Sequence, residues 1–562
     1  MRLAKLLSQC HVSQGRVRPG GILPTSNVRV GPIRPLSSSS KHGDEEHPPE
    51  PKELMDYLDS LTNYEKLGTP KGGGTDSDEG LDLGRMRRLL DRLGNPHSKF
   101  KAVHIAGTKG KGSTAAFVAS VLRAAGYNVG CYTSPHLLSM RERMTLGKSG
   151  DLVSAEALNS LFYSIKHKLD EAIQNEQGCL THFEVLTAMA YSLFSDEKVD
   201  IAVIEAGLGG ARDATNVISN AGLAASVITT IGEEHLLALG GSLKNIARAK
   251  AGIIKQGRPV ILGGPFLPHI EHILRDKAAK MSSPVISAYD AGIGSTVRGI
   301  KVLHGRPYQL SDLKIQFESD SHSFLELSNL KLRMLGSHQL HNASTAACTA
   351  LCLRNQGWRI SDDSIRAGLE TTYLLGRSQY LSVKEAEELG LPRSRVLLDG
   401  AHTKESAKAL VETIRMAFPE AQVALVVAMA SDKDHSAFAR EFLSGMRQLA
   451  AVFLTEVNIA GGKSRTTSAS VLRDHWVQAS KEVGINVFRA ELDGSQGLPL
   501  DQLVGLARKS QGTSLLVSES SLENCMVLAN RTLEQSAGKQ PSLIVVTGSL
   551  HAVSSVLASH RS

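Results

Sequence analysis

A glycine-rich turn between a strand-like run and a helix-like run constrains this chain most. In AVHIAGTKGKGSTAAF (residues 102–117), an apolar run ends at Gly107 and an alanine-rich helix is predicted to begin near Ser113. Glycines let backbone amides approach an anionic oxygen closely, and a helix N-terminus adds partial positive charge. Lys111 supplies a flexible cation, and Ser113 or Thr114 supplies a hydroxyl group. The turn therefore predicts nucleotide binding at the first strand–helix unit of an α/β fold.

The spacing of this turn departs from the usual phosphate-loop pattern, which places four residues between the first glycine and Gly-Lys. Here Gly107, Gly110 and Gly112 bracket Lys111 in a tighter arrangement. A purely structural turn between strand and helix is the alternative, but the flanking strand and helix favour a phosphate loop. The predicted nucleotide contacts are Gly107, Thr108, Lys109, Gly110, Lys111, Gly112 and Ser113.

Strand-length and helix-length segments alternate along most of the chain, which is typical of an α/β protein with a parallel sheet. Apolar runs recur at 128–134, 199–207 and 224–232, separated by helix-length segments. Short alternating runs between 285 and 335 predict a small antiparallel excursion. Beyond residue 376, RVLLDG, QVALVVAMA, AVFLTEV and SLIVVTG are the strand candidates of a second α/β region.

These patterns predict three parts of the chain: a leader and linker at 1–45, a larger phosphate-loop domain at 46–373, and a smaller α/β domain at 374–562. A chain of 562 residues with 41% hydrophobic residues is long enough for several domains, each with its own core. It contains no apolar run of about 18 residues, so we expect no membrane span. Its six cysteines are scattered without a CxxC pair, which predicts neither a disulfide scaffold nor a zinc site.

The net charge of +7 is concentrated at the N-terminus. The first 41 residues hold seven Lys and Arg and no acidic residue; subtracting these from the 63 basic residues leaves 56, equal to the 56 acidic ones. An acid-free, serine-rich leader with arginines predicts import into an organelle, here the mitochondrial matrix. A plastid leader and a basic tail on a cytosolic protein are the alternatives. The neutral remainder predicts no nucleic-acid partner.

Further motifs stand in a fixed order after the phosphate loop. They are YTSPHLLSMRERM (132–144), VIEAGLGGARDATN (203–216), TTIGEEH (229–235), ARAKAGIIK (247–255), HQLHNA (338–343), GR (376–377) and LLDGAHT (397–403). With GTKGKGS, this series resembles the Mur-ligase superfamily and, within it, the dihydrofolate synthase and folylpolyglutamate synthase family. The resemblance implies an ATP-dependent ligase that joins glutamate to a folate-type carboxylate through an acyl phosphate.

The resemblance implies that Ser134, Glu205 and His235 bind a divalent metal ion. Each residue closes a strand-like run, so all three can gather at one edge of a parallel sheet, where such sheets bind ligands. Oxygen donors with one imidazole suit Mg²⁺; a monovalent cation is a further candidate. Taken alone, Ser134 is also explained as a turn residue and His235 as a loop histidine, whereas a buried Glu205 is costly unless it is paired.

The remaining site residues also follow from the resemblance. Lys250 would be carbamylated and would help to hold a metal ion; a salt bridge on a solvated helix face is the alternative. Phe183 and Asp213 would contact the acceptor, although an Asx turn explains Asp213 equally well. The residues predicted to contact nucleotide or phosphate from later in the chain are Asn342 on the adenine side, Arg377, Asp399 on the ribose side, and His402, which is also a catalytic candidate.

Three functions remain open on the sequence. THFEVLTAMAY (181–191) and GLGGARDATN look more like dihydrofolate synthase, which uses dihydropteroate, than like a polyglutamylating enzyme, which lengthens tetrahydrofolate tails. Thr181 is equally explained as an ordinary helix cap. A nucleotide-dependent switch or kinase is the alternative outside the ligases. We expect a monomer with ATP, Mg²⁺, L-glutamate and a pteroate or folate as its small-molecule partners.

Overall fold

The computed structural model describes residues 52–75, 81–303, 305–317, 324–391, 394–491, 514–536 and 540–559. The predicted leader at 1–45 lies outside these residues. The described residues all belong to one compact unit, Pro49–Ser562. None of the described helices is both long enough and apolar enough to cross a membrane.

An eight-stranded sheet organises the first half of the chain, in the order β4-β3-β2-β5-β1-β6-β7-β8. Its strands are β1 (Lys101–Ala106), β2 (Val129–Tyr132), β3 (Met144–Leu146), β4 (Asp151–Leu152), β5 (Ile201–Glu205), β6 (Leu223–Ile228), β7 (Val260–Leu262) and β8 (Val285–Ser287). All neighbours from β2 to β8 pair in parallel, while β3 and β4 are antiparallel. The carboxyl ends of β1, β2, β5 and β6 therefore meet at one edge.

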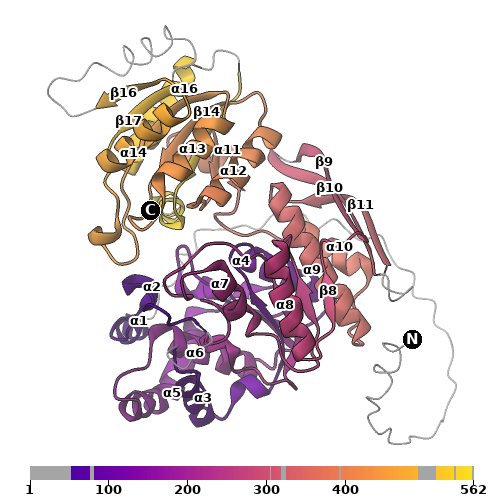
Figure 1. The fold of residues 1–562 in the computed structure, drawn as a ribbon. Helices are drawn as coiled ribbons and strands as arrows, with labels where there is room; N and C mark the ends of the chain where they lie inside the picture. The colour runs from indigo at the N-terminus through magenta and orange to yellow at the C-terminus, as the bar shows by residue number, and fades with distance from the viewer. Residues whose placement is uncertain are drawn as a thin grey trace, which may run out of the picture. The chain divides into compact units, whose positions relative to one another are not determined.

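Helices cover both faces of this sheet, because residues alternate between two cores along each strand. Val103 and Ile105 of β1 face one core, and Ala102 faces the other. The first core is completed by α4 (Lys111–Ala124), α9 (Ser337–Asn355) and α10 (Asp362–Thr371). The second is completed by α1 (Lys52–Asp59), α3 (Leu83–Arg92), α5 (Ala155–Asn175) and α6 (His182–Asp196), with α7 (Leu243–Ala251) and α8 (Pro268–Lys280) beside β6 and β7. Figure 1 labels these helices around the sheet.

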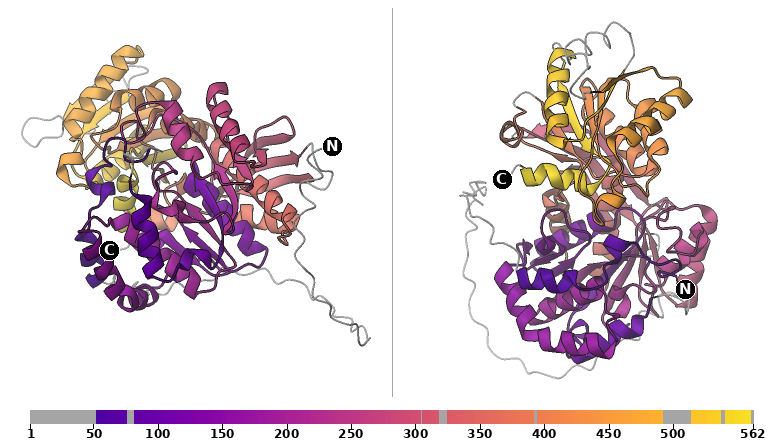
Figure 2. Two further views of the ribbon diagram at one scale, coloured as in Figure 1. Left: turned by 60° about the horizontal axis from the view of Figure 1, so that its bottom comes forward. Right: turned by 90° about the vertical axis from the view of Figure 1, so that its left-hand side faces the viewer.

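The predicted antiparallel excursion is a three-stranded sheet of β9 (Ile293–Leu303), β10 (Arg306–Gln316) and β11 (Phe324–Leu332). The apolar face of β10 and β11 joins the same core as α9 and α10. The sheet lies beside these two helices in Figures 1 and 2. It begins later than predicted, because residues 285–287 form the last parallel strand of the first sheet.

A second, seven-stranded sheet follows in the order β12-β13-β18-β14-β15-β17-β16. Its strands are β12 (Gln379–Tyr380), β13 (Arg395–Leu398), β14 (Gln422–Val427), β15 (Leu449–Leu454), β16 (Val487–Glu491), β17 (Ser514–Ser518) and β18 (Ser542–Thr547). Only β12 pairs antiparallel. Two cores sandwich it, one with α11 (Val383–Glu388), α16 (Leu522–Ser536) and α17 (Leu550–Ser559), the other with α12 (Lys404–Ala417), α13 (His435–Gly445) and α14 (Ala469–Glu482). The right-hand view of Figure 2 shows these helices on opposite sides.

The fold class predicted from the sequence is confirmed as mixed α/β with large, mainly parallel sheets. The four strand candidates beyond residue 376 are β13, β14, β15 and β18, which are the buried centre of the second sheet. The limits 46–373 and 374–562 remain a prediction, with the eight-stranded sheet before residue 373 and the seven-stranded sheet after it.

Candidate active site

The phosphate loop leaves β1 at Gly107, where only glycine fits. Its φ is +152°, and a Cβ atom there would lie 1.9 Å from the Thr229 hydroxyl oxygen. That hydroxyl donates to the carbonyl oxygen of Lys109 at 2.6 Å. The end of β6 therefore packs directly against the loop.

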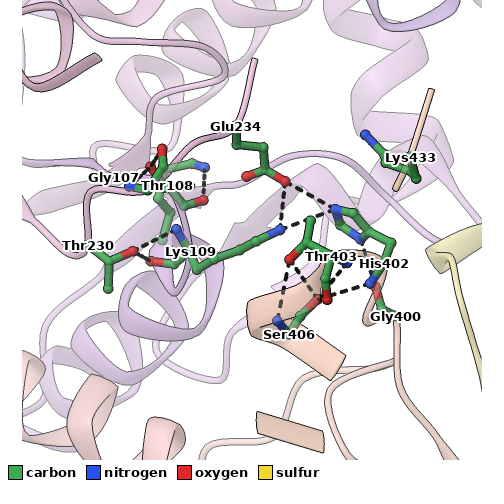
Figure 3. Close-up of polar contacts among 12 residues, drawn as sticks. Gly107, Thr108, Lys109, Thr230, Glu234, Gly400, His402, Thr403, Ser406 and Lys433 are labelled. Atoms are coloured by element: carbon green, nitrogen blue, oxygen red, sulfur yellow. Dashed lines mark hydrogen bonds and ion pairs between the residues drawn. The ribbon is translucent and has the colours of Figure 1, made fainter. Parts of the chain in front are cut away.

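The first residues of the loop are bonded to the segment after β6 (Figure 3). The Thr108 amide donates to the Thr230 carbonyl at 2.7 Å, and the Lys109 amide donates to the Thr230 hydroxyl at 2.9 Å. The Thr108 hydroxyl accepts from the Gly232 amide at 2.9 Å. These groups hold the loop in shape, so Thr108 and the Lys109 backbone act as supports for the loop.

The helix after the loop begins at Lys111, two residues earlier than predicted. Its N-cap, Gly110, has a φ of +84° and provides no side-chain cap. The first amides of a helix have no carbonyl partner within it, so an uncapped N-terminus offers them to an anion. The Lys111 Nζ lies 3.9 Å from Glu205 Oε1, at the carboxyl end of β5. Loop and acidic residue thus share one edge of the sheet.

Glu205 is 4% exposed and has few partners. Its Oε2 accepts from the Ser134 amide at 3.1 Å, while Oε1 faces the Lys111 ammonium beyond hydrogen-bond distance. Burial raises the pKa of Glu205 above its ordinary value, although the charge of Lys111 and the hydrogen bond from the Ser134 amide lower it. A buried, sparsely bonded carboxylate is suited to bind a cation. The structure therefore brings two of the predicted metal ligands, Ser134 and Glu205, into contact.

His235, the third predicted metal ligand, lies in an exposed turn after β6 with a φ of +54°. The charges of Glu234, Lys111, Lys433 and Lys250 all act on its imidazole. Within the described ranges, no group of three His, Cys, Asp or Glu residues could hold a metal ion. Of the three predicted metal ligands, only Glu205 and His235 are residues of these types. The Ser134 hydroxyl and the Glu205 carboxylate are hard oxygen donors, which fit Mg²⁺.

Lys250 is buried on α7, and its Nζ donates to the Gly107 carbonyl at 2.8 Å. Burial and the charge of Lys111 lower the pKa of Lys250 to about 7. The predicted alternative, a salt bridge on a solvated helix face, is wrong for this residue. In the described structure, Lys250 ties the phosphate loop to α7.

Asp213 and Phe183, the predicted acceptor contacts, differ in their surroundings. Asp213 is buried, and its oxygens accept from the Leu208 amide at 2.7 Å and the Thr215 amide at 3.0 Å, which is the geometry of an Asx turn. Phe183 packs on Gly207, where a Cβ atom would lie 2.7 Å from the ring. Asp213 therefore shapes the loop after β5, and Phe183 lies over its first turn.

The residues around Phe183 cap α6. Thr181 is the N-cap and forms a capping box with Glu184. Glu184 is also bonded to Arg85 Nε at 2.9 Å. Thr181 and Glu184 of the THFEVL run therefore have a structural role at the start of α6, and Phe183 of the same run packs on Gly207.

Arg377 and Asp399 lie in two adjoining loops of the second sheet. Asp399 accepts from the Ser378 amide at 2.7 Å and from the Ala401 amide at 3.0 Å, which fixes the residue next to Arg377. The charge of Arg377 acts on Glu205. Asp399 therefore fixes the backbone of the residue next to Arg377.

Asn342 of α9 contacts the phosphate loop. A Cβ atom at Gly110 would lie 2.4 Å from Asn342 Oδ1. Asn342 Nδ2 donates to Gln339 Oε1 at 3.0 Å. A hollow of about 520 Å³ adjoins this end of α9. It is lined by Ser295, Thr296, Val297, Ser337, His338, Leu340, His341, Ala409 and Glu412.

His402, also predicted, comes from the loop after β13 and meets Glu234, a residue that the sequence reasoning missed (Figure 3). Glu234 Oε1 lies 3.1 Å from His402 Nε2 and 2.6 Å from Lys109 Nζ. Burial alone would raise the pKa of Glu234, but the His402 bond and the charge of Lys109 hold it well below its usual range. The charge of Lys433, which is paired with Asp432 at 3.1 Å, also acts on Lys109. The two adjacent glutamates of TTIGEEH, next to the predicted ligand His235, were the feature of the sequence that could have pointed to Glu234.

Comparison with known proteins agrees with this geometry. The Mur ligase middle domain matches residues 105–350, and the dihydrofolate synthetase C-terminal domain matches residues 382–559. A dihydrofolate synthase/folylpolyglutamate synthase of Bacillus subtilis (strain 168) is 34% identical over 355 residues, which are 63% of this chain and 76% of that relative. The mitochondrial folylpolyglutamate synthase of Homo sapiens is 31% identical over 454 residues, 74% of this chain and 70% of the relative.

A solved structure, the folylpolyglutamate synthase of Thermotoga maritima, aligns with a TM-score of 0.65 and 28% identity over 90% of this chain and 96% of its own. The fold and the phosphate-loop site define a Mur-ligase-type enzyme. The chain belongs to the dihydrofolate synthase/folylpolyglutamate synthase family, the ATP-dependent folate–glutamate ligases.

Proposed function

We propose that this chain is a dihydrofolate synthase, which joins L-glutamate to 7,8-dihydropteroate. The observation that carries the ligase chemistry is the phosphate loop, where Lys111 faces Glu205 and the charge of Arg377, from the second sheet, acts on the same carboxylate. Sites for phosphoryl transfer work mainly by positioning and charge stabilisation. The acceptor is inferred from THFEVLTAMAY and GLGGARDATN, with Phe183 over the turn after Glu205.

The reaction needs activation because a carboxylate anion repels nucleophiles and has no good leaving group. The acceptor carboxylate attacks the terminal phosphorus of ATP; a carboxyl oxygen–phosphorus bond forms, and the bond to ADP breaks. The glutamate amine then attacks the acyl carbon of the acyl phosphate. The new carbon–nitrogen bond forms as inorganic phosphate leaves with the electron pair of the carbon–oxygen bond, and the nitrogen loses a proton.

The residues divide this work by position. The uncapped start of α4 and Lys111 would hold the phosphates, and Arg377 would neutralise charge that develops on the transferred group. Phe183 would pack against the acceptor ring. Ser134, Glu205 and His235 would hold Mg²⁺, which supplies additional positive charge to the phosphates when it is bound.

Glutamate dependence separates the ligase from the alternative outside this class. A nucleotide switch or kinase has no use for free glutamate, so its ADP release would be the same with or without glutamate. The decisive assay offers 7,8-dihydropteroate and tetrahydrofolate separately, each with ATP, Mg²⁺ and L-glutamate, and identifies the products. We expect dihydrofolate from the first acceptor.

Folylpolyglutamate synthase is the second candidate function. The names of the relatives support it, because they include both activities. Elongation of tetrahydrofolate with no use of dihydropteroate would reject the first proposal and establish this one. Products from both acceptors would make the enzyme bifunctional.

For location, we propose import into the mitochondrial matrix, on the basis of the seven positive charges without an acidic residue in residues 1–41. The mitochondrial name of the Homo sapiens relative agrees with this. A fusion of residues 1–45 to a fluorescent protein should enter mitochondria. Plastid or cytosolic fluorescence would reject the proposal.

A further inference from the structure

His104 is a fully buried histidine of β1, a central strand of the first sheet, and it stands three residues before Gly107. Its Nε2 atom lies 2.8 Å from the hydroxyl oxygen of Thr215, in the segment that follows β5. Burying an imidazole costs free energy unless its nitrogens are bonded. The bonded nitrogen of His104 is the one that faces Thr215, so this contact shows what the buried ring is connected to.

The directions of the hydrogen bonds around Thr215 follow from the number of protons. A hydroxyl group has one proton, and Thr215 donates it to Asp213 Oδ1, an oxygen that also accepts from the Thr215 amide at 3.0 Å. The hydroxyl can therefore only accept from His104, which places the imidazole proton on Nε2. Burial and the charge of Lys255 lower the pKa of His104 to about 3, so the ring is neutral. In the described structure its Nδ1 is buried without a hydrogen-bond partner.

This short chain of hydrogen bonds leads to the backbone on which Phe183 packs. The second oxygen of Asp213, Oδ2, accepts from the Leu208 amide at 2.7 Å. Leu208 follows Gly207, where a Cβ atom would lie 2.7 Å from the Phe183 ring. A neutral donor in the centre of the sheet is thus connected, through two side chains, to the turn against which this ring lies.

Thr215 is also held by α6, the helix that carries Phe183. The hydroxyl of Tyr191, a buried residue of α6, donates to the Thr215 carbonyl at 2.9 Å. Bonds from β1 and from α6 therefore meet at one residue. Without the bond from His104, only Asp213 would orient the Thr215 hydroxyl.

We propose that His104 is a positioning residue for the acceptor substrate of the ligase. Its Nε2–H fixes the Thr215 hydroxyl and, through Asp213, the turn on which Phe183 packs. A side chain holds its ligand in one geometry only when the groups behind it are locked by packing and hydrogen bonds. The proposal rests on the proposed function for the role of Phe183 as an acceptor contact.

The phosphate loop has supports of its own, although it leaves the same strand. It is held by the hydroxyl groups of Thr229 and Thr230, and in the described part of the chain His104 is bonded to neither. A change at His104 should therefore act on the acceptor and leave nucleotide binding as it is.

The test combines steady-state kinetics of the full chain with calorimetry of MgATP binding. His104→Leu removes the donor at similar size, so the KM for 7,8-dihydropteroate should rise about tenfold, while kcat changes less than about threefold. The Kd for MgATP should stay the same. The midpoint of urea unfolding should not fall, because leucine also removes the unpartnered Nδ1. His104→Gln places an N–H the same number of bonds from the backbone and should restore the acceptor KM to within about threefold.

Thr215→Val breaks the same chain at its centre with little change in shape, and it decides the question if His104→Leu does not fold. Its acceptor KM should rise at least as much as that of His104→Leu. The double variant should be no worse than Thr215→Val alone, because both changes remove one chain of bonds. Ser226→Ala is the matched control: it removes another buried hydrogen bond, from Ser226 of β6 to the Ile253 carbonyl at 2.8 Å, and should leave the acceptor KM unchanged.

A loss of stability in His104→Leu with no change in the acceptor KM would overturn the proposal, since the residue would then be purely structural. Additive effects in the double variant would also overturn it, as would a rise in the Kd for MgATP equal to that in the acceptor KM. If the enzyme elongates tetrahydrofolate and does not use dihydropteroate, the proposed function fails. The same comparison of KM values, made with tetrahydrofolate, then still decides the role of His104.

Discussion

Two lysines of one loop point toward different carboxylates. Lys109 contacts Glu234 at 2.6 Å, whereas Lys111 approaches Glu205 at 3.9 Å. Lys111 begins α4 and lies near the carboxyl end of β5, at the edge of the sheet where we predict the nucleotide to bind. The sequence spacing alone assigns a phosphate role to both lysines, but it does not assign different partners.

Lys111→Ala tests the first of these roles. We expect kcat to fall by about 10²–10³, because one preorganised charge at the transferred group is lost. The fold should persist, since Lys111 is partly exposed and is bonded weakly to its own loop at 3.5 Å. Steady-state ADP release and circular dichroism measure the two effects. A near-normal kcat with normal ATP affinity would contradict the assignment.

Lys250 is a residue whose pH dependence follows from its burial. Its pKa of about 7 in the folded chain lies below the value of 10.5 for an ordinary lysine. Between these values the unfolded chain binds a proton that the folded chain does not, so stability rises with pH across the window from about pH 7 to 10.5. Below pH 7 both states are protonated, and the full cost of burying the charge remains.

The same shift makes carbamylation of Lys250 feasible at neutral pH, because only a neutral amine reacts with CO₂. A carbamate keeps one N–H, which preserves the bond to the Gly107 carbonyl. We expect Lys250→Ala to lose activity and to regain part of it with formate, while Lys250→Arg stays inactive. Nearly full activity of Lys250→Arg would show that a positive charge suffices.

At the scale of elements, the loop between β2 and β3 is organised by its own acidic residue. Glu142 accepts from the amides of Leu137, Leu138 and Ser139 at 2.8, 2.9 and 3.0 Å. The next residue, Arg143, is 1% exposed and is bonded through two nitrogens to Glu65, at 2.8 and 2.6 Å. The motif YTSPHLLSMRERM therefore contains a loop that is held by hydrogen bonds and that includes the predicted metal ligand Ser134.

Glu142→Gln should loosen this loop, because a single amide oxygen replaces two carboxylate oxygens. We expect the KM for the acceptor to rise about tenfold and the free energy of unfolding to fall by about 1–3 kcal/mol. The Kd for ATP should be unchanged, since the phosphate loop makes none of these bonds. Calorimetry, acceptor titration and urea unfolding give the three values; Glu405→Gln, on the exposed side of α12, is the control.

A rise in the Kd for ATP equal to the rise in the acceptor KM would contradict this division. It would mean that the loop supports the whole site through Glu205, to which the Ser134 amide donates.

How well each feature could be predicted from the sequence depends on how far apart in the chain the interacting residues lie. The phosphate loop and the buried strands depend on neighbouring residues, so apolar runs and glycines were sufficient to locate β1, β2, β5, β6 and the central strands of the second sheet. Residues such as Ser134 and Glu205 were placed together because parallel strands end at one edge. The edge strand β16 and its neighbour β17 were not predicted from the sequence.

Contacts between distant loops could not be predicted in the same way. Glu234 meets a residue 168 positions away, and Arg377 acts on Glu205 from the other sheet. No periodicity of the sequence records such pairs. The Asx turn of Asp213 and the cap formed by Thr181 are local, and for this reason the structural alternatives given for them were correct predictions of their geometry.

At the scale of the whole molecule, the halves that carry the two large sheets meet at several separate points. Besides the Glu234–His402 contact, the Ser554 hydroxyl donates to the Leu137 carbonyl at 2.7 Å, and Arg465 donates to the Glu65 carbonyl at 2.8 Å. Leu137 and Leu138 also pack against a core of the second sheet. The loop between β2 and β3 and the phosphate loop are thus both in contact with the second half of the chain.

Arg377 is the residue whose effect depends most on this arrangement. It lies in a loop of the second sheet, donates to its neighbour Gly376 at 3.2 Å, and exerts its charge on Glu205 of the first. Arg377→Gln should therefore lower kcat by about 10²-fold or more, because a fixed cation is lost where charge develops on the transferred phosphoryl group. The Kd for ATP should change much less, since Lys111 and the start of α4 remain.

Single-turnover ADP formation and calorimetry measure these two quantities, and Arg395→Gln is the control, because Arg395 is an exposed arginine of β13 in the same half. An equal loss in ATP affinity and in kcat would place Arg377 in ground-state binding. No loss in either would mean that the two halves do not meet in this way during the reaction.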